Sequence, residues 1–343
     1  MSATASMEDR SSFQATNGVQ PAPEDPTSPS NPNITPAWGD PSYPVSQPPL
    51  TRKERLMDRL TRAGDKLGLP FMKRIRWAYR PYFAEFLGTL AFTALATGLV
   101  TNYQLQLAKG HMTYFGQTFY SGISLMYAIY VVGGVSGGHV NPAITLLFAM
   151  WRGFAWRKVP GYWFAQFLGA FCGAGIVYLM YLPHYDLANM GERNIIGPNE
   201  TGSIFASVPS QVRGNYSCFL GEIVGSAILG GAIFAFIDRY NIPPTYLAPI
   251  AIGLAQAVIA AGISSPGRLD FNPARDFGSR VLLAAAGYGG QVFSAYDGYM
   301  WIPIVGPMIG TVTGGALYDF FIVTGPTPEQ IEAKEMEDIE RGD

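Results

Sequence analysis

The chain contains 343 residues, of which 48% are hydrophobic and 14% are charged, and its formal net charge is −2. Several uncharged stretches approach the length of about 20 residues that a bilayer-spanning helix needs, which excludes an ordinary soluble domain. The near-neutral charge implies no nucleic-acid partner. Cys172 and Cys218 lie in or beside apolar stretches, which favours buried thiols over a disulfide framework. We therefore expect a polytopic membrane protein without redox chemistry.

The first 80 residues divide into two segments. Residues 1–50 are poor in aliphatic residues and, from residue 21, rich in Pro, Ser and Asn, so they should form a disordered tail. Residues 51–80 contain ten Lys and Arg residues against three acidic ones, with Leu56, Leu60 and Leu67 at near-helical spacing. We interpret this segment as a basic amphipathic helix beside the membrane. Binding to anionic lipid, or covering the inner face of the membrane domain, is the alternative.

Six apolar stretches are long enough to cross a bilayer, namely 82–102, 118–138, 162–182, 217–237, 246–264 and 300–323. Two shorter ones, 141–150 and 272–286, are predicted to be re-entrant half-helices. The basic residues of the connecting loops lie on the same side as the N-terminus: Arg152, Arg157, Lys158 and Arg239. By the positive-inside rule this side is the cytoplasm, which also places the acidic end, residues 325–343, there. The prediction is an all-α membrane protein with both termini in the cytoplasm.

The sequence is internally duplicated. Residues 84–92 read "AEFLGTLAF" and residues 221–229 read "GEIVGSAIL", with Glu85 and Glu222 in matching positions. Repeat one, 81–182, and repeat two, 216–324, each hold three spans and one half-helix, so the second repeat is inverted and the half-helices enter from opposite faces. A carboxylate within a span is costly and needs a partner. We expect both glutamates to brace the loops before the half-helices rather than to relay protons.

Each half-helix begins with an Asn-Pro-Ala triplet, in "GHVNPAIT" (138–145) and in "FNPARDFG" (271–278). Asn is a preferred N-cap and Pro suits the first helical turn. Extended backbone at membrane depth survives only when it is buried in protein or lines a water-filled cavity, so a narrow pore is predicted. Two positive helix ends would repel cations there, whereas the Asn amides would hold a neutral hydroxyl compound. The predicted pore residues are Asn141, Pro142, Ala143, Asn272, Pro273 and Ala274.

Through "AEFLGT", "SGGHVNPAIT", "YWFAQFLGA" and "FNPARDFGSR", the chain resembles the major intrinsic protein family, the aquaporins and aquaglyceroporins, over about residues 82–323. The resemblance implies the aquaporin fold and a homotetramer of independent pores. It also implies passive conduction of water or small uncharged solutes, with no cofactor, no metal and no enzymatic activity. The tails suggest a eukaryotic and, in particular, fungal setting.

Four positions resemble the glycerol-type branch of the family: Asp276, Arg280, Pro303 and Ile304. Water-specific members usually carry small residues at the first pair and aromatic residues at the second. Each of the four could instead simply pack in the fold. Their joint occurrence predicts a glycerol channel that also conducts water, and a water-selective channel is the alternative.

The resemblance places the selectivity filter at Ser121, Ala260, Leu269 and Arg275. Glycerol channels usually have aromatic residues at the first and third of these positions. Because two of the residues here are small, the opening should be wider, which makes urea, hydrogen peroxide and larger polyols alternative solutes. A shift of register that brings Tyr120 or Phe119 into the lumen would remove this inference. We expect Arg275 to bind solute and to exclude cations.

Two unusual charges lie near the filter. Arg268 and Asp270 either pair with one another at the outer mouth, or Asp270 offsets part of the positive field of Arg275. His139, two residues before Asn141, should satisfy backbone groups of its loop.

Asn199 and Asn215 begin glycosylation sequences in a loop that the topology makes extracytoplasmic.

Two other transport classes fit the sequence less well. A secondary transporter needs coupling-ion sites and rocking halves, and the spans offer no second cluster of acids. An ion channel would need rings of like charge or carbonyl cages without an opposing Arg and paired helix-dipole ends. The predicted function is therefore a passive channel for glycerol and other small uncharged solutes with water, excluding ions and protons. We expect it in the plasma membrane, with a vacuolar or other internal membrane as the alternative, and the N-terminal tail is a candidate gate of the inner mouth.

Overall fold

The computed structural model describes residues 71–107, 113–209, 214–238, 240–241, 245–264 and 268–322, together with Gly325 and Met336. The predicted N-terminal tail, residues 51–70 of the basic segment and nearly all of the acidic end lie outside these residues. Residues 71–80 belong to the first described helix, so that part of the basic segment is helical and continuous with the first span.

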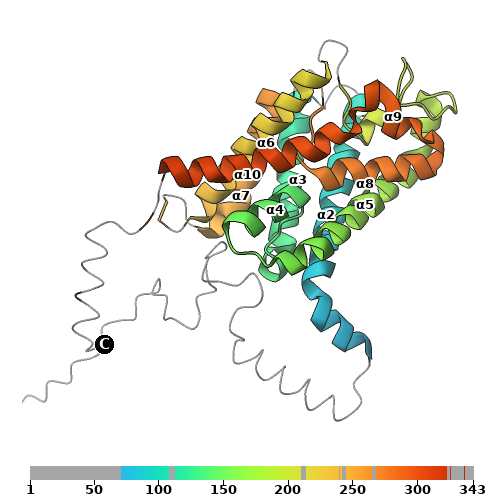
Figure 1. Cartoon of the computed structure of the whole chain (residues 1–343). Coiled ribbons are helices and arrows are strands. Elements are labelled where there is room, and N and C mark those ends of the chain that lie inside the picture. Colours follow the sequence, from blue (N-terminus) through green and yellow to red (C-terminus); the bar gives the residue numbers. More distant parts are fainter. Residues whose placement is uncertain are drawn as a thin grey trace, which may run out of the picture. The chain divides into compact units, whose positions relative to one another are not determined.

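The described residues are helical, with no strand among them (Figure 1). The helices are α2 (Phe71–Gln104), α3 (Tyr114–Ser136), α4 (Pro142–Trp151), α5 (Val159–Ala188), α6 (Asn215–Ile237), α7 (Ala248–Ile263), α8 (Pro273–Leu283), α9 (Gln291–Gly298) and α10 (Ile302–Ile322). Short turns of helix lie between them: η1 (Trp156–Lys158), η2 (Gly202–Ile204), η3 (Thr245–Leu247), η4 (Ala284–Tyr288) and η5 (Tyr299–Trp301). The predicted all-α class is confirmed.

Five of the described helical segments are long and apolar enough to cross a membrane: the first is Ala78–Gln104 within α2, and the others contain α3, α5, α6 and α10. Helix α7 has 16 residues, a length of about 24 Å, and is with α4 one of the shorter apolar helices. The half-helix predicted at 272–286 ends at Leu283 and continues as the π-type turn η4, in which Gly287 has φ 101°. Apolar composition continues through this turn, so composition alone did not reveal the end of the helix.

Glycines bring the helices of each repeat into close contact. A Cβ atom placed on Gly169 of α5 would lie 2.4 Å from the carbonyl oxygen of Phe86 in α2, and one on Gly310 of α10 would lie 2.3 Å from that of Ile223 in α6. Pairs α2–α5 and α6–α10 are thus built alike. Without a side chain, the backbones approach closely enough for dense packing in a bilayer.

The two repeats meet through α3 and α7. A Cβ on Gly122 would lie 2.2 Å from the carbonyl oxygen of Gly253, and one on Gly253 would lie 2.7 Å from that of Gly122. Gly122 precedes Asn141 by the same distance in sequence as Gly253 precedes Asn272. This contact fixes which residues of the two repeats are equivalent.

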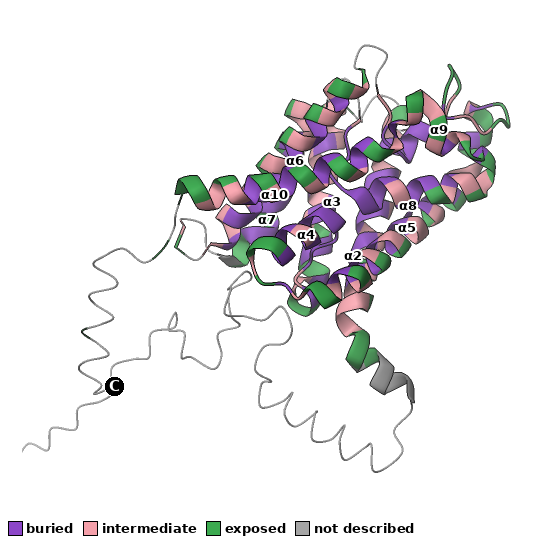
Figure 2. Cartoon of the chain, in the orientation of Figure 1, coloured by how far each residue is buried: buried purple, intermediate pink, exposed green. Residues whose placement is uncertain are grey.

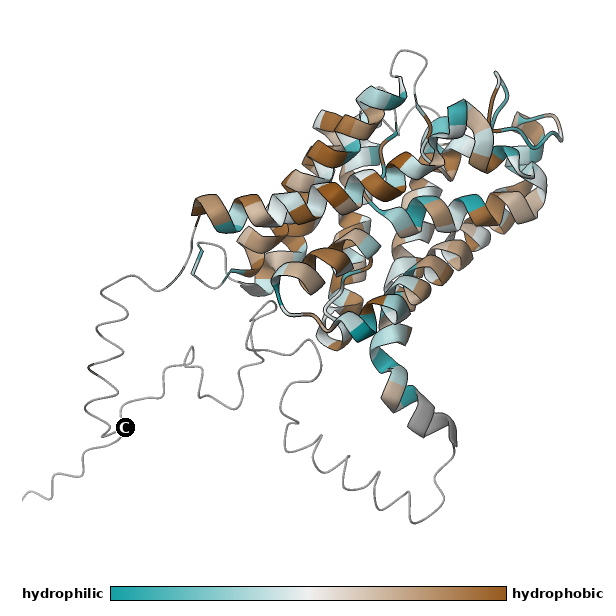
Figure 3. Cartoon of the chain, viewed as in Figure 1, coloured by the Kyte–Doolittle hydropathy of each residue, from teal (hydrophilic) through white to brown (hydrophobic). Residues whose placement is uncertain are grey.

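Burial follows the expectation for a multi-pass membrane protein. Buried residues lie on the helix faces turned toward other helices (Figure 2), and the outer faces carry many hydrophobic residues (Figure 3). Phe164, Leu179 and Val258 are examples of large apolar side chains on these outer faces. An apolar exterior of this kind suits lipid rather than water.

Candidate functional site

Both Asn-Pro-Ala triplets begin a helix. Asn141 caps α4, because its Oδ1 accepts a hydrogen bond from the backbone N–H of Ala143 (2.9 Å). Asn272 caps α8 in the same way, accepting from the second and third residues of that helix (3.0 and 3.3 Å). Pro142 and Pro273 occupy the first helical position, where no N–H is needed. Each Asn oxygen is therefore engaged, and each side-chain NH₂ group points beyond its own helix.

The two loops are joined by a reciprocal pair of hydrogen bonds. Asn141 Nδ2 donates to the carbonyl oxygen of Phe271 (2.8 Å), and Asn272 Nδ2 donates to that of Val140 (2.9 Å). Val140 and Phe271 both adopt left-handed backbone conformations, with φ of 52° and 53°. This conformation is strained for branched and aromatic residues and costs about 1–3 kcal/mol at each position. The same strain in both loops indicates that the junction of the half-helices is held firmly by its surroundings.

Glu85 of α2 holds the first loop. Its Oε1 accepts from the Ser136 hydroxyl (2.6 Å) and the His139 N–H (3.0 Å), and its Oε2 accepts from the Val140 N–H (2.7 Å) and the Gln166 amide (2.7 Å). The carboxylate is fully buried. Four donors around one buried carboxylate satisfy both of its oxygens, so its position is well determined.

Glu222 of α6 holds the second loop with fewer contacts. Its carboxylate oxygens accept from the backbone N–H groups of Asp270 (2.9 Å) and Phe271 (3.0 Å). Gly306 of α10 packs against it, since a Cβ there would lie 2.6 Å from Glu222 Cβ. Each glutamate thus binds the two N–H groups that precede an Asn cap.

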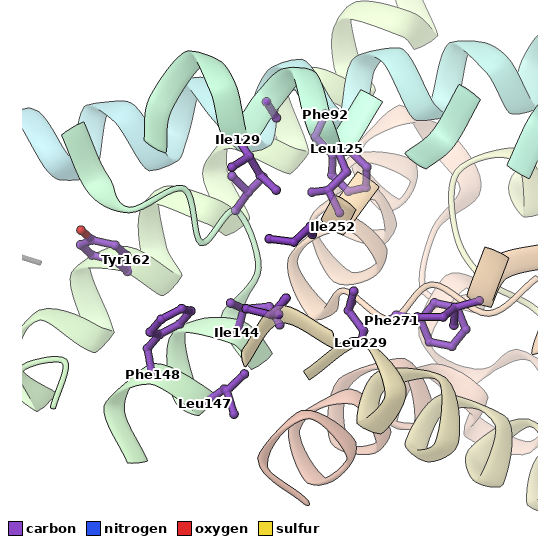
Figure 4. Packing of buried hydrophobic residues seen from close by; sticks show 14 of the residues in the cluster. Phe92, Leu125, Ile129, Ile144, Leu147, Phe148, Tyr162, Leu229, Ile252 and Phe271 are labelled. Carbon is purple, nitrogen blue, oxygen red and sulfur yellow. The ribbon is translucent and has the colours of Figure 1, made fainter. Parts of the chain in front are cut away.

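A narrow cavity lies at the junction of the half-helices. Figure 4 shows the apolar side chains that converge on it from α2, α3, α4, α6 and α7, among them Phe92, Leu125, Ile129, Ile144 and Leu229. The polar lining comes from His139, Asn141, Gln256, Asp270 and Asn272. The volume is about 20 Å³, enough for a water molecule. The lining is thus mostly apolar and offers hydrogen bonds at a few fixed points.

None of the four predicted filter residues lines this cavity, but Ser121 is placed to extend it. Leu125 and Ile129 line the cavity from α3 at a spacing of four residues, and Ser121 continues their row by one turn. Tyr120 is 49% exposed, and the ring of Phe119 stacks on that of Phe115 at 5.8 Å. Helical geometry turns both aromatic residues away from the cavity row, which supports the register that assigns Ser121.

Ala260 extends the corresponding row of α7. Ile252 and Gln256 line the cavity, and Ala260 follows them by one turn. The hydroxyl of Tyr114 donates to the Ala260 carbonyl oxygen (3.1 Å), which joins the ends of α3 and α7 here. Leu269 is buried in the loop before α8. These positions lie beyond the cavity, toward the side that the predicted topology makes extracytoplasmic.

Arg275 forms a buried ion pair with Asp270. Arg268 instead donates to the carbonyl oxygen of Ile204 (2.6 Å). Of the two interpretations of these charges, the structure supports the one in which Asp270 offsets Arg275. Buried atoms of this group make no hydrogen bond in the described part of the chain, namely Arg268 Nε and Nη2, Asp270 Oδ2 and Arg275 Nε.

Comparison with known proteins decides the family. The sequence profile described as Major intrinsic protein matches residues 72–318. The chain belongs to the major intrinsic protein family. The resemblance found in the four motifs is confirmed.

Relatives and a solved structure agree. Aquaglyceroporin-2 of Rhizophagus irregularis is 40% identical over 254 residues, which cover 73% of this chain and 79% of that protein. Aquaporin-9 of Homo sapiens is also 40% identical, over 72% of this chain and 84% of its own. The X-ray structure of the aquaglyceroporin from Plasmodium falciparum superposes with a TM-score of 0.61 at 27% identity, covering 71% of this chain and 96% of that one. The predicted aquaporin fold is confirmed.

In this major intrinsic protein, Asp276 and Arg280 of α8 form a buried ion pair (2.6 Å). Asp276 Oδ2 also accepts from the N–H (2.7 Å) and hydroxyl (2.6 Å) of Ser207. Arg280 donates to the carbonyl oxygens of Ser207 and Val292. The pair therefore ties the second half-helix to the loop after α5 and to α9. A spacing of four residues on a helix is typical of such a pair, although the sequence analysis used the two residues only as glycerol-type markers, and nothing in the sequence indicated Ser207.

The other predicted markers and the histidine lie in the helix interfaces. Pro303 is buried and Ile304 half-buried at the start of α10. The ring of His139 stacks on Phe148 at 4.8 Å, and its Nδ1 lies 3.2 Å from the hydroxyl of Thr145. The ring thus contacts a side chain, while the backbone N–H of His139 reaches Glu85.

Some residues of the major intrinsic protein site were missed in the sequence. Ser136 and Gln166 bind Glu85, and Tyr162 donates to the Ser136 carbonyl oxygen (2.8 Å). Gln256 lines the cavity. Gln166 and Gln256 are amides within otherwise apolar spans, and this was a usable signal because such groups need partners in a bilayer.

The Asn side chains of the two glycosylation sequences differ in solvent exposure. Asn199 is exposed in the loop after α5. Asn215 is half-buried at the first turn of α6, where its side-chain amide donates to the carbonyl oxygen of Tyr296 (3.0 Å). Modification is therefore proposed at Asn199 rather than Asn215.

Proposed function

We propose that this major intrinsic protein is a passive channel for glycerol and other small uncharged solutes together with water, and that it excludes ions and protons. The junction of the two half-helices carries the proposal. Asn141 and Asn272 lie at the cavity with their side-chain amides beside two helix N-termini. An oxygen atom of water or of a hydroxyl group is the partner that this arrangement prefers.

Charge exclusion follows from the same arrangement. Partial positive charge at both helix ends disfavours a cation or a hydronium ion at the point where the passage is narrow. The apolar side chains around it offer no replacement for an ion's hydration shell. Arg275 adds positive charge nearby, reduced by Asp270. A neutral solute loses less hydration free energy than an ion and passes more easily.

The relatives support glycerol as a solute, because those from Rhizophagus irregularis and Plasmodium falciparum are named aquaglyceroporins. Small side chains at Ser121 and Ala260 support a wide opening. A second candidate function is therefore passage of urea or hydrogen peroxide, tested by uptake of each in the same vesicles. We further propose a homotetramer with both termini in the cytoplasm, in the plasma membrane.

The test is reconstitution of the full chain in liposomes, with light scattering after an osmotic shock. A sorbitol shock reports water flow, and a glycerol shock reports solute entry. Fast re-swelling in glycerol, well above that of empty liposomes and slowed by Ser121→Trp, is the expected result. Rapid shrinkage without re-swelling would identify a water-selective channel and overturn the proposal.

A further inference from the structure

Helix α7 carries a single polar side chain. Its sequence, APIAIGLAQAVIAAGI, is apolar at every other position. An amide placed in the hydrocarbon interior without a partner costs several kcal/mol. Gln256 therefore needs a reason for its presence.

The position of Gln256 does not indicate that the amide stabilises the packing of the helices. Its side chain is only 6% exposed and lines the cavity together with Asn141 and Asn272. Within the described part of the chain it makes no hydrogen bond to another residue. A structural glutamine would be bonded to a neighbouring helix, as Gln166 is to Glu85 (2.7 Å). The amide of Gln256 instead faces the space through which solute would pass.

The repeat provides an internal comparison. Gln256 lies 16 residues before Asn272, and the residue 16 positions before Asn141 is Leu125. The close contact between Gly122 and Gly253 supports this equivalence. Leu125 also lines the cavity. Since the fold accommodates leucine at the equivalent position, it does not require an amide there.

We propose that Gln256 is a solute-binding residue of the pore and that it favours polyhydroxyl solutes over water. This proposal rests on the proposed glycerol channel. The Asn141 and Asn272 oxygens are engaged in helix caps, so these residues offer only N–H donors to the cavity. Of the Asp270 carboxylate, Oδ1 is engaged by Arg275 and Oδ2 is a charged acceptor without a hydrogen bond in the described part of the chain, so Gln256 is the neutral side-chain acceptor of this group. The Gln256 amide adds a side-chain acceptor as well as donors, and a hydroxyl group uses both kinds of partner.

The consequence is larger for glycerol than for water. A polyol that enters the narrow passage gives up hydrogen bonds to water at several hydroxyl groups, whereas a water molecule in a file keeps its neighbours. One added hydrogen bond contributes about 0.5–1.5 kcal/mol, which corresponds to roughly a twofold to tenfold change in rate. Gln256→Met removes the amide and keeps an unbranched side chain. Leu254→Met, on the outward face of the same helix where Leu254 is 42% exposed, is the matched control.

Glycerol and sorbitol shocks on liposomes with the full-length wild type and both variants test the proposal. We expect Gln256→Met to lower glycerol permeability about twofold to tenfold, to change water permeability less, and Leu254→Met to match the wild type. Equal glycerol permeability in wild type and Gln256→Met, or an equal fall in glycerol and water, would overturn it. Gln256→Asn should recover part of the loss. Wild-type vesicles without glycerol entry would refute the channel proposal itself, which separates the two failures.

Discussion

Replacement of Glu85 by Gln tests how the first half-helix loop is held. The new side chain has the same size but only one acceptor oxygen. Glu85 accepts two hydrogen bonds on each oxygen, from Ser136 and His139 on one and from Val140 and Gln166 on the other. Either orientation of the amide therefore loses two. At about 1.5–3 kcal/mol for each bond to a charged group, the free energy of unfolding should fall by roughly 3–6 kcal/mol.

The equivalent change in the second repeat should cost less. Glu222 accepts one hydrogen bond on each oxygen, from Asp270 and Phe271, so Glu222→Gln loses one, or roughly 1.5–3 kcal/mol. Thermal unfolding in detergent, followed by the loss of the size-exclusion peak, ranks the variants by melting temperature. Exposed Glu192→Gln is the control and should match the wild type. A Glu222→Gln variant with a melting temperature at or below that of Glu85→Gln would contradict the difference in hydrogen bonding between the two glutamates.

Three further predictions concern a buried ion pair, a glycine contact and a buried carboxyl group. Asp276→Asn breaks a buried ion pair and should lower the free energy of unfolding by roughly 3–5 kcal/mol; a negligible fall in melting temperature would contradict this. Gly122→Ala places a methyl group against the Gly253 carbonyl oxygen and should reduce the yield of folded protein, whereas Gly98→Ala, with nothing within 4 Å, should not; equal yields on size exclusion would refute the packing argument. Burial raises the pKa of Glu200 above its ordinary value of 4.5, so the folded state binds this proton more tightly, and the free energy of unfolding should fall as pH rises from about 4.5 through the raised pKa. Glu200→Gln should therefore weaken the dependence of the melting temperature on pH in this range. The same pH dependence in the variant and the wild type would be evidence against this role.

Local signals in the sequence predicted the elements well. Asn141 and Pro142 act within a few residues of their own helix start, so capping rules were sufficient to place the first residue of α4. Similarly, the uncharged stretches located the long helices to within a few residues, except that α2 begins earlier, at Phe71, and α5 ends later, at Ala188. A basic segment gives no hydrophobic signal, and the helix nevertheless continues through it.

Contacts between segments that are distant in the sequence could not be predicted from it. The bond from Asn141 to the Phe271 carbonyl oxygen joins residues 130 positions apart. The repeated motif predicted that the two half-helices enter from opposite faces, but it did not predict which atoms are in contact. The choice between Arg268 and Arg275 as the partner of Asp270 also depended on the loop backbone, since both arginines lie within five residues of it. Only the folded loop decides which guanidinium group reaches the carboxylate.

In the proposed channel, solute passes through the cavity at the junction of the half-helices. A thiol-blocking measurement tests it directly, in a background with Cys172 and Cys218 replaced. Ile252→Cys places a thiol in the cavity lining, and Val258→Cys, at a position 72% exposed on the outer face of the same helix, is the control. A small methanethiosulfonate reagent should stop glycerol re-swelling of Ile252→Cys liposomes and leave that of Val258→Cys liposomes unaffected. Unchanged glycerol entry after complete labelling of Ile252→Cys, established by mass, would contradict passage through this cavity.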